Sequence, residues 1–250
     1  MRSDQPPWTP VLVPCGNRFL ASMLAQGPCP VDAERSLTFD ELATAAKMSS
    51  RRRAEWIGGR ICLFSALNAL GLFDPCAAPA TRASLLVASN GAPIIPAGSV
   101  GSLSHKARVI VCLAGVDQGH RLGIDLEFIV GSEERLASRV LTPNELKSVE
   151  QVAPTMRAKA VAIHFSLKES IYKALPRGQQ PIVDFHDIEI LDWEPVDDSV
   201  LLNVSAQVCV NGKFAQVCGT VETRSKWILT TATFPWAPVP WIPERPREAT

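Results

Sequence analysis

The pattern of hydrophobic and polar residues along the chain predicts both helices and strands. In residues 50–70, apolar side chains recur at helical spacing, and Gly71 is placed to end a helix there. Shorter apolar or alternating runs predict strands over residues 84–88, 108–114 and 123–127. The first 30 residues carry many prolines and little periodicity, so we expect loop and short strand there.

Further helices and strands are predicted in the C-terminal half. Thr142, Pro143 and Glu145 form a capping-box pattern with proline at the first helical position, so a short helix should begin there, and residues 165–173 also suit a helix. Strand patterns cover residues 185–193, 201–210, 214–221 and 226–234, with a hairpin signal at Asn211-Gly212. We therefore expect helices packed on an antiparallel sheet, followed by an extended Pro-rich tail from about residue 235.

Composition and charge narrow the class of protein. With 250 residues, of which 46% are hydrophobic, the chain can form one domain or two small ones with a substantial core. Lys plus Arg and Asp plus Glu both number 25, which argues against a protein that wraps nucleic acid or coats an anionic membrane. The seven cysteines lack zinc-site spacing, and no apolar run reaches about 18 residues. We therefore expect reduced thiols, no membrane span and a cytoplasmic location.

Two segments carry acidic residues that can bring three carboxylates together. In residues 123–127, Asp125 and Glu127 alternate with apolar residues, so a strand would point both carboxylates to one face. Glu169 and Lys173 stand four apart on a predicted helix and project from the same side. Three carboxylates repel one another without a compensating charge, and such oxygen ligands suit Mg²⁺. The pattern predicts a metal and phosphate site.

Small hydroxyls and a histidine in residues 101–105 precede a buried apolar run and can donate hydrogen bonds to an anionic ligand. Each of these motifs also has a purely structural interpretation. An Asp-x-Glu strand is usually a solvated face, and Glu169 with Lys173 is commonly a surface pair contributing about 0.3 kcal/mol. His105 could be structural, and arginines 51–53 could be a solvated helix start. The joint order of the motifs favours a site.

That order resembles the signature of the 4′-phosphopantetheinyl transferase superfamily. Residues 101–105, 123–127 and 165–173 match the signature, residues 52–60 look like the basic helix of its Sfp-type members, and residues 91–96 resemble their Gly-x-Pro loop. The resemblance runs from about Arg52 to about Ile190 and is closest to the subgroup of the enterobactin synthetase component D. It implies two pseudo-symmetric α+β lobes, residues 1–121 and 122–250, with the active site in the cleft between them.

The activity implied by the resemblance is Mg²⁺-dependent transfer of the 4′-phosphopantetheine arm of coenzyme A to a serine of an apo acyl or peptidyl carrier protein, releasing 3′,5′-adenosine bisphosphate. The enzyme would be a monomer, and the subgroup points to secondary metabolism. Asp125, Glu127 and Glu169 would hold the metal ion, while Glu169 as base and Lys173 would be catalytic. The residues implied to contact coenzyme A are Arg53, Arg60, Ser104, His105 and Lys168.

The sequence departs from the family pattern at two positions. Ala92 stands in the middle of the Gly-x-Pro loop, where a basic residue is often found, and Lys106 replaces a small residue after His105. Lys106 could intrude on the site or supply the missing charge. Two other functions stay open: a different Mg²⁺-dependent phosphoester enzyme, and a non-catalytic module that binds coenzyme A or a carrier protein. The intact acids and Lys173 argue against the second.

Overall fold

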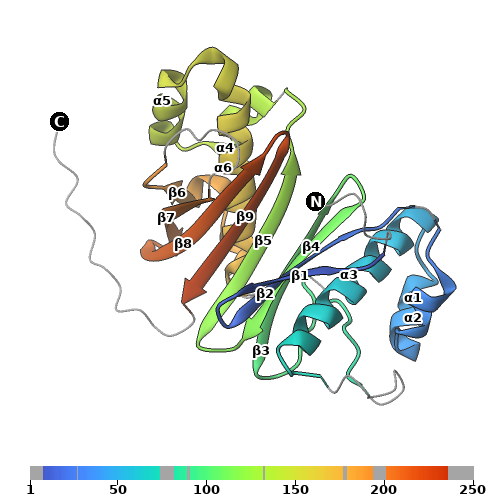
Figure 1. Ribbon diagram of the computed structural model, residues 1–250. Helices are drawn as coiled ribbons and strands as arrows, with labels where there is room; N and C mark the ends of the chain where they lie inside the picture. Colours follow the sequence, from blue (N-terminus) through green and yellow to red (C-terminus); the bar gives the residue numbers. More distant parts are fainter. Residues whose placement is uncertain are drawn as a thin grey trace. The chain divides into compact units, whose positions relative to one another are not determined.

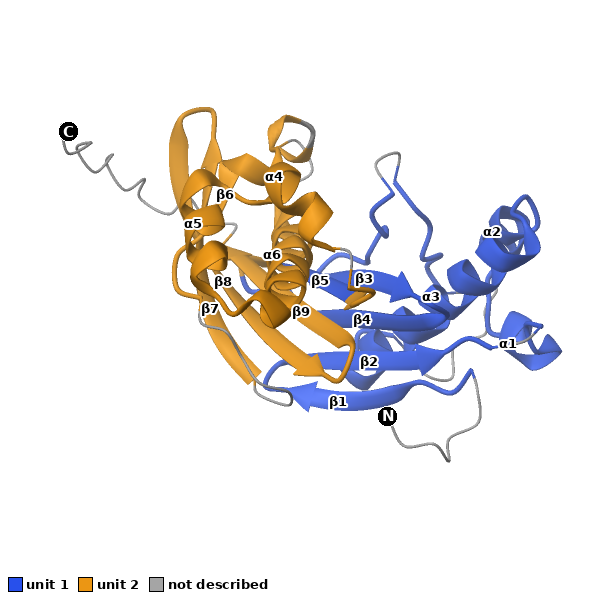
Figure 2. Ribbon diagram, turned by 90° about the horizontal axis from the view of Figure 1, so that it is seen from above, with its two compact units in different colours: residues 1–118, 122–126 blue, residues 119–121, 127–250 orange. Residues whose placement is uncertain are grey.

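Helices and antiparallel strands follow one another in the computed structural model, which confirms the expected α+β class (Figure 1). The structure describes residues 8–26, 28–73, 82–88, 91–131, 133–176, 179–193 and 201–235. Two compact units are present: unit 1 is Met1–Gln118 with Leu122–Leu126, and unit 2 is Gly119–Arg121 with Glu127–Thr250 (Figure 2). The predicted Pro-rich tail lies almost entirely outside the described residues.

Unit 1 contains an antiparallel sheet with the strand order β1-β2-β4-β3. Its strands are β1 (Val11–Cys15), β2 (Arg18–Leu24), β3 (Ser99–Lys106) and β4 (Val109–Val116). Its helices are α1 (Val31–Arg35), α2 (Phe39–Ala45) and α3 (Ser50–Ala69). The helix over 50–70 and the strand over 108–114 were predicted, and β1 and β2 lie within the first 30 residues, where loop and short strand were expected.

Helix α3 packs directly on the sheet of unit 1 and forms the core with β2 and β4 (Figure 1). Glycine at position 58 permits this close approach, because a Cβ atom there would lie 2.3 Å from Ile110 Cδ1 and 2.9 Å from Met23 Cε. The helix ends as predicted, with Gly71 at φ +71°, a conformation that favours glycine.

The strand predicted over residues 84–88 is wrong. The segment contributes an isolated bridge at Val87 instead of a ladder. At Leu85, buried side chains supply the hydrogen bonds: Leu85 N donates to Glu41 Oε1 at 2.6 Å, and Leu85 O accepts from Arg60 Nη1 at 2.7 Å. Leu86 O and Ala88 N pair with a neighbouring backbone, at Ile94 N and Ala92 O. The apolar run therefore marked a half-buried extended segment here, paired with a neighbouring segment at a single bridge.

Unit 2 contains α6 and most of a second sheet with the strand order β5-β9-β8-β7-β6. The strands are β5 (His120–Phe128), which contributes residues to both units, β6 (Ile188–Ile190), β7 (Leu201–Val210), β8 (Lys213–Arg224) and β9 (Trp227–Pro235). The helices are α4 (Ala137–Val140), α5 (Pro143–Gln151) and α6 (Pro154–Ala174), with 3₁₀ turns at η1 (Glu133–Leu136), η2 (Gln180–Ile182) and η3 (Phe185–Asp187).

Most predicted elements of this half are confirmed. The hairpin between β7 and β8 turns at Asn211 and Gly212, both with positive φ, as in a type I′ turn. Helix α6 packs its apolar side on β8 and β9. The strand predicted over residues 185–193 is shorter than expected, because Asp184 caps a 3₁₀ turn and β6 begins only at Ile188.

One local design recurs in the two halves of the chain. Thr38 and Thr142 each cap a helix in a complete capping box, with Glu41 and Glu145 at the third helical position. The two threonines are 104 positions apart (142 − 38), and so are the first residues of α3 and α6 (154 − 50) and the last residues of β2 and β5 (128 − 24). The chain therefore contains an internal structural repeat that its letters do not reveal.

Each capping glutamate also joins its helix to a later segment of the same unit. Leu85 N donates to Glu41 Oε1 at 2.6 Å, and Ile190 N donates to Glu145 Oε1 at 2.8 Å. Each glutamate is buried and paired with a buried cation, Arg82 for Glu41 and Lys168 for Glu145. The loop after α3 supplies Arg82, while α6 itself supplies Lys168, so the same role is filled from different places in the two repeats.

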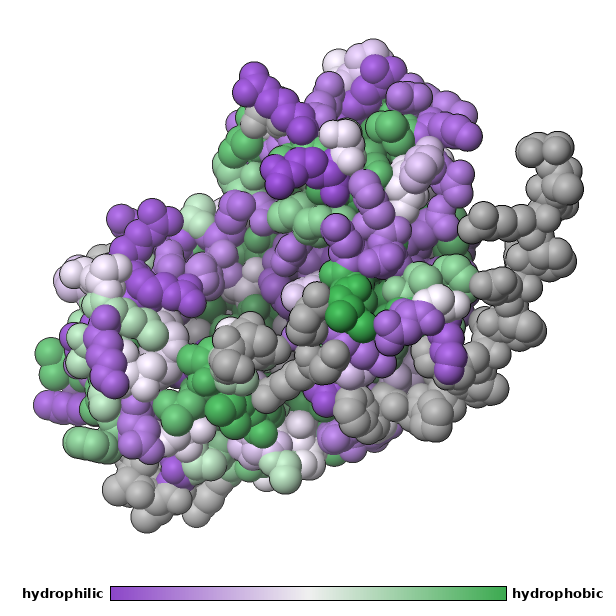
Figure 3. Space-filling model, turned by 180° about the vertical axis from the view of Figure 1, so that it is seen from behind, coloured by the Kyte–Doolittle hydropathy of each residue, from purple (hydrophilic) through white to green (hydrophobic). Residues whose placement is uncertain are grey.

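Some large apolar side chains of the described residues are exposed. Figure 3 shows apolar side chains standing among hydrophilic ones on one face. Exposed large apolar residues include Phe39, Val130, Ile182 and Leu201. Single residues of this kind are normal on soluble domains. Among the residues that the structure describes, no helix is both long and apolar enough to cross a membrane.

Candidate functional site

The acidic strand lies where the sequence predicts it. Asp125 is 4% exposed in β5, between the buried side chains of Ile124 and Leu126, and Glu127 is half-buried in the same strand. Ser104 Oγ on β3 donates a hydrogen bond to Asp125 Oδ1 at 2.9 Å. One of the predicted acids is thus held by one of the predicted ligand-binding residues, within unit 1.

The first turn of α3 lies against the predicted histidine. Arg52 Nη1 donates to His105 Nε2 at 2.8 Å, and His105 Nδ1 lies 3.8 Å from Glu55 Oε2. In this arrangement the ring proton is on Nδ1. The side chain of Arg52 is about half exposed (54%), so its guanidinium can also reach an anion in solvent. Sequence reasoning did not single out Arg52, although Arg52, Trp56 and Arg60 follow one another at the four-residue spacing of one helix face.

The two arginines named from the sequence are engaged within unit 1. Arg53 Nη2 pairs with Glu34 Oε1 at 2.9 Å. Arg60 is 3% exposed, donates to Leu85 O, and stacks its guanidinium 4.6 Å from the centroid of the Trp56 ring. Burial lowers the pKa of Arg60 to about 10. Both arginines therefore have structural roles in this unit, and their contacts with coenzyme A stay predictions.

Residues 91–93 of the Gly-x-Pro loop lie beside residues 87–88, with an isolated antiparallel bridge between Val87 and Pro93. Ala88 N donates to Ala92 O at 2.9 Å, and Gly91 has φ +83°, a conformation that favours glycine. Lys106 is exposed at the end of β3. Neither Ala92 nor Lys106 disturbs the elements beside it, so the two departures from the family pattern leave this local fold intact.

In unit 2, Glu169 and Lys173 lie one turn apart on α6, and both are half-buried. Lys173 is in the last turn of the helix, where a cation is stabilised by the partial negative charge of the helix end. This part of the prediction, a carboxylate and an ammonium on one side of a helix, is present in the structure.

A pocket of about 550 Å³ opens beside Glu169. Its walls include Tyr172 on α6 and, from the segment after that helix, Ile182, Asp184 and Phe185. The lining is mixed, with charged side chains beside apolar ones; Ile182 is 54% exposed and Tyr172 is 36% exposed, so both are accessible from solvent. In the sequence, a signal for this pocket was Tyr172, the single tyrosine of the chain, which lies three positions after Glu169.

Lys168, predicted to contact a phosphate, is fully buried with its ammonium engaged inside unit 2. Its Nζ donates to Glu145 Oε2 at 2.6 Å and to the carbonyl oxygens of Val140 at 2.7 Å and Phe185 at 2.9 Å. An ammonium has three donors, and all three are used. No donor of this ammonium is left for a phosphate oxygen in this conformation. Burial lowers the pKa of Lys168, and the negative charge of Glu145 opposes that shift.

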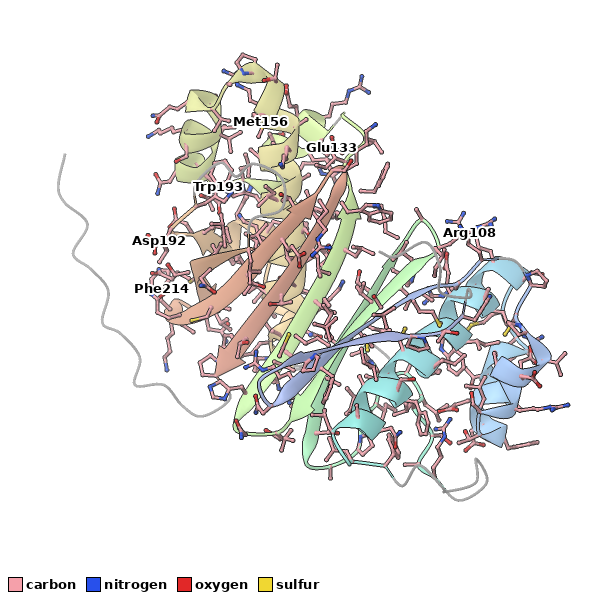
Figure 4. All side chains as sticks on the ribbon, viewed as in Figure 1. Arg108, Glu133, Met156, Asp192, Trp193 and Phe214 are labelled. Carbon is pink, nitrogen blue, oxygen red and sulfur yellow. The ribbon has the colours of Figure 1, made fainter. Side chains whose placement is uncertain are left out.

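His164 has a structural role on the same helix. Its Nδ1 donates to Ala160 O at 2.9 Å, and its ring lies edge-on against Trp193, labelled in Figure 4, with 4.9 Å between the centroids. Burial lowers the pKa of His164, so the neutral ring is favoured at this position.

The internal repeat allows each acidic candidate to be compared with the residue at the equivalent position of the first repeat. By the offset of 104, Asp125, Glu127 and Glu169 correspond to Ala21, Met23 and Ser65. Strand β2 and helix α3 form with these small or apolar residues, so an acid is not needed at those positions to build the elements. The acids of the second repeat are therefore candidates for function rather than for folding.

The predicted metal ligands are divided between the units. Asp125 belongs to unit 1, whereas Glu127 and Glu169 belong to unit 2. Within the ranges that the structure describes, no three His, Cys, Asp or Glu side chains form a group that could hold a metal ion. The donor chemistry fits a hard divalent cation, since all three are carboxylates and the Asp125 carboxylate accepts a hydrogen bond from a hydroxyl, as metal-ligating carboxylates commonly do. The three-carboxylate site stays a prediction.

Comparison with known families gives two matches along this chain. Residues 121–230 match the model described as the 4′-phosphopantetheinyl transferase superfamily, and residues 40–115 match that of the 4′-phosphopantetheinyl transferase N-terminal domain. The first range contains Asp125, Glu127, Glu169 and Lys173, and the second contains Arg52, Ser104 and His105.

Curated relatives match a shorter part of the chain. A holo-[acyl-carrier-protein] synthase of Lactobacillus johnsonii is 37% identical over 73 residues, which are 29% of this chain and 60% of the relative. The enzyme of the same name from Lactobacillus helveticus is 33% identical over 73 residues, 29% of this chain and 61% of the relative. The crystal structure of the Thermotoga maritima holo-[acyl-carrier-protein] synthase aligns with a TM-score of 0.36 and 21% identity, covering 45% of this chain and 61% of that one. The chain thus spans about 60% of the length of these relatives.

Proposed function

Because the chain belongs to the 4′-phosphopantetheinyl transferase superfamily, we propose that it transfers the 4′-phosphopantetheine arm of coenzyme A to a serine hydroxyl of an apo carrier protein. In the reaction, the serine oxygen forms a new bond to the phosphorus that carries the pantetheine arm. The bond from that phosphorus to 3′,5′-adenosine bisphosphate breaks, and the serine proton passes to a base.

The observation that carries this proposal is the pocket beside Glu169. The pantetheine arm is a narrow chain of apolar carbons and two amides, and a pocket of about 550 Å³ lined by Tyr172, Ile182 and Phe185 offers the apolar contact that such a chain needs. The carboxylate of Glu169 lines the same pocket and would face the phosphate at the root of a bound arm. This arrangement suits a substrate that joins an apolar arm to a charged group.

Glu169 is proposed as the base that accepts the serine proton, directly or through a water molecule. Lys173, one turn further along α6, would neutralise charge that grows on the oxygen of the leaving group. Mg²⁺, held by Asp125, Glu127 and Glu169, would polarise the phosphate oxygens when bound. In unit 1, His105 with the neighbouring Arg52 supports binding of the diphosphate, because both side chains offer N–H donors.

The test is incubation of the protein with coenzyme A, Mg²⁺ and an apo carrier domain, followed by intact-mass measurement of the carrier. A gain of one phosphopantetheine arm per carrier is expected. Omission of the carrier separates the alternatives: a general phosphoester enzyme would still release adenosine bisphosphate. A panel of fatty-acid, polyketide and peptide carriers that all keep their mass would refute the proposal.

Replacing Lys173 with alanine tests the catalytic helix separately from binding. If the ammonium acts mainly on the leaving oxygen in the transition state, kcat should fall by about 10²-fold while KM for coenzyme A changes by less than about threefold. Steady-state kinetics with one carrier measures both constants. A large rise in KM with an unchanged kcat would instead assign Lys173 to uniform binding of the coenzyme.

Further details of the proposal come from the sequence. They are the choice of Mg²⁺ among divalent ions, the monomeric state, the cytoplasmic location and a carrier from secondary metabolism. Metal substitution in the transfer assay and the carrier panel address the first and the last of these. Light scattering at working concentration addresses the monomeric state.

A further inference from the structure

We propose that Ser104 is a positioning residue that orients the carboxylate of Asp125 for metal binding, and that it does not contact the diphosphate of coenzyme A. The proposal rests on the function proposed above, because that function requires Asp125 to hold a metal ion. It revises the role that the sequence implied for Ser104.

The hydrogen bond itself is the first observation. Ser104 Oγ donates to Asp125 Oδ1 at 2.9 Å, and the two residues are 8% and 4% exposed. A serine hydroxyl has one proton to donate. Since that proton is used on Asp125, Ser104 has none left for a phosphate oxygen, which offers only acceptors. A direct contact with the diphosphate would require this buried bond to break.

The second observation is that two neighbouring hydrogen bonds join β3 to β5. Ser102 precedes Ser104 by two positions, so both side chains are on the same face of β3. Ser102 Oγ accepts a hydrogen bond from Ile124 N at 3.2 Å. β3 is the last strand in the order β1-β2-β4-β3, and its two serine hydroxyls contact adjacent residues of β5. Ser102 positions the backbone of β5, and Ser104 positions the carboxylate one residue later.

The consequence concerns metal affinity. Without this donor the Asp125 carboxylate loses one of the hydrogen bonds that fix its orientation, so ordering it around an ion costs additional free energy. Loss of a hydrogen-bond partner of a metal ligand typically weakens metal binding by about 10- to 100-fold. A residue that contacts only the diphosphate would leave the affinity of the coenzyme-free protein for metal unchanged.

The experiment uses the full chain as wild type and as three variants, Ser104→Ala, Ser104→Thr and Ser102→Ala. Mn²⁺ binding to the coenzyme-free protein is measured by the loss of the free-ion electron paramagnetic resonance signal, since Mn²⁺ takes the same oxygen ligands. KM for coenzyme A is measured at saturating metal. Ser104→Ala should raise the Kd for Mn²⁺ about 10-fold and change KM by less than twofold. Ser104→Thr, which keeps the hydroxyl, should restore the affinity.

Ser102→Ala is the matched control, because it removes a buried hydroxyl from the same face of β3 without touching Asp125. It should leave Mn²⁺ affinity within twofold of wild type, with thermal melting used to confirm that every variant is folded. Equal losses in Ser102→Ala and Ser104→Ala would overturn the proposal in favour of general loosening of β5. An unchanged Kd in Ser104→Ala, or no Mn²⁺ binding by the wild type, would also overturn it.

Mn²⁺ binding and carrier mass together distinguish failure of the positioning role from failure of the proposed function. If the wild type binds Mn²⁺ and Ser104→Ala weakens that binding, but no carrier gains mass, the positioning role holds and phosphopantetheine transfer fails. If carriers gain mass and Ser104→Ala raises only the KM for coenzyme A, transfer holds and Ser104 is a diphosphate contact after all.

Discussion

Replacement of Glu169 by glutamine should reduce phosphopantetheine transfer by at least about 100-fold without unfolding the protein. Glutamine has nearly the same size as glutamate but cannot accept the serine proton, and loss of a general base typically costs about 10²- to 10⁴-fold in rate. The fold should tolerate the change, because Glu169 is half-buried on α6 and the equivalent position of the first repeat is Ser65. Intact-mass time courses under saturating coenzyme A and metal measure the rate.

A control variant is available in the same unit. Glu150 is exposed on α5, so Glu150→Gln removes the same charge away from the pocket and should keep the rate within twofold of wild type. Equal rates for Glu169→Gln and wild type would remove both the base and the metal-ligand assignments. Equal losses in the two variants would point to net charge rather than to the pocket.

Replacement of Glu145 by alanine should destabilise the protein by about 3–5 kcal/mol, the usual cost of leaving one partner of a buried ion pair alone. Glu145 accepts hydrogen bonds from Lys168 Nζ at 2.6 Å, from Thr142 N at 2.7 Å and from Ile190 N at 2.8 Å. Alanine would leave a buried ammonium without its counter-charge and two backbone donors without an acceptor. Chemical denaturation followed by tryptophan fluorescence measures the loss.

Replacing Lys168, the other member of this ion pair, gives a second test. Lys168→Met should cost less than Glu145→Ala, because the two backbone donors would still satisfy the carboxylate, and the double variant should cost less than the two single losses together. Lys147, exposed on α5, provides Lys147→Met as a control with little effect. A Lys168→Met protein of wild-type stability but with a raised KM for coenzyme A would restore the phosphate contact that the sequence implied for Lys168.

Local patterns along the chain were sufficient for most of the secondary structure. The capping box at Thr142, the hairpin at Asn211-Gly212 and the end of α3 at Gly71 are confirmed, because each depends on residues within one turn of each other. The strand predicted over 84–88 failed because the backbone of Leu85 bonds to the side chains of Glu41 and Arg60, which are distant in sequence, and the segment contributes an isolated bridge at Val87. A short apolar run alone cannot distinguish a strand in a ladder from such an anchored segment.

What the sequence by itself determined is the family and the α+β class, and it supplied Asp125, Glu127, Glu169 and Lys173 as candidate site residues. The family, the fold class and the candidate residues depend on residue identity and on short-range spacing, which can be read from the sequence without knowing the fold. The tertiary structure alone decided how the polar residues divide their work. It buries Lys168 against Glu145, brings Arg52 to His105, and turns Ser104 toward Asp125. The physical reason is that a hydrogen-bond donor is assigned by what folding brings within 3 Å of it, and those partners lie 21 to 53 positions away in the chain.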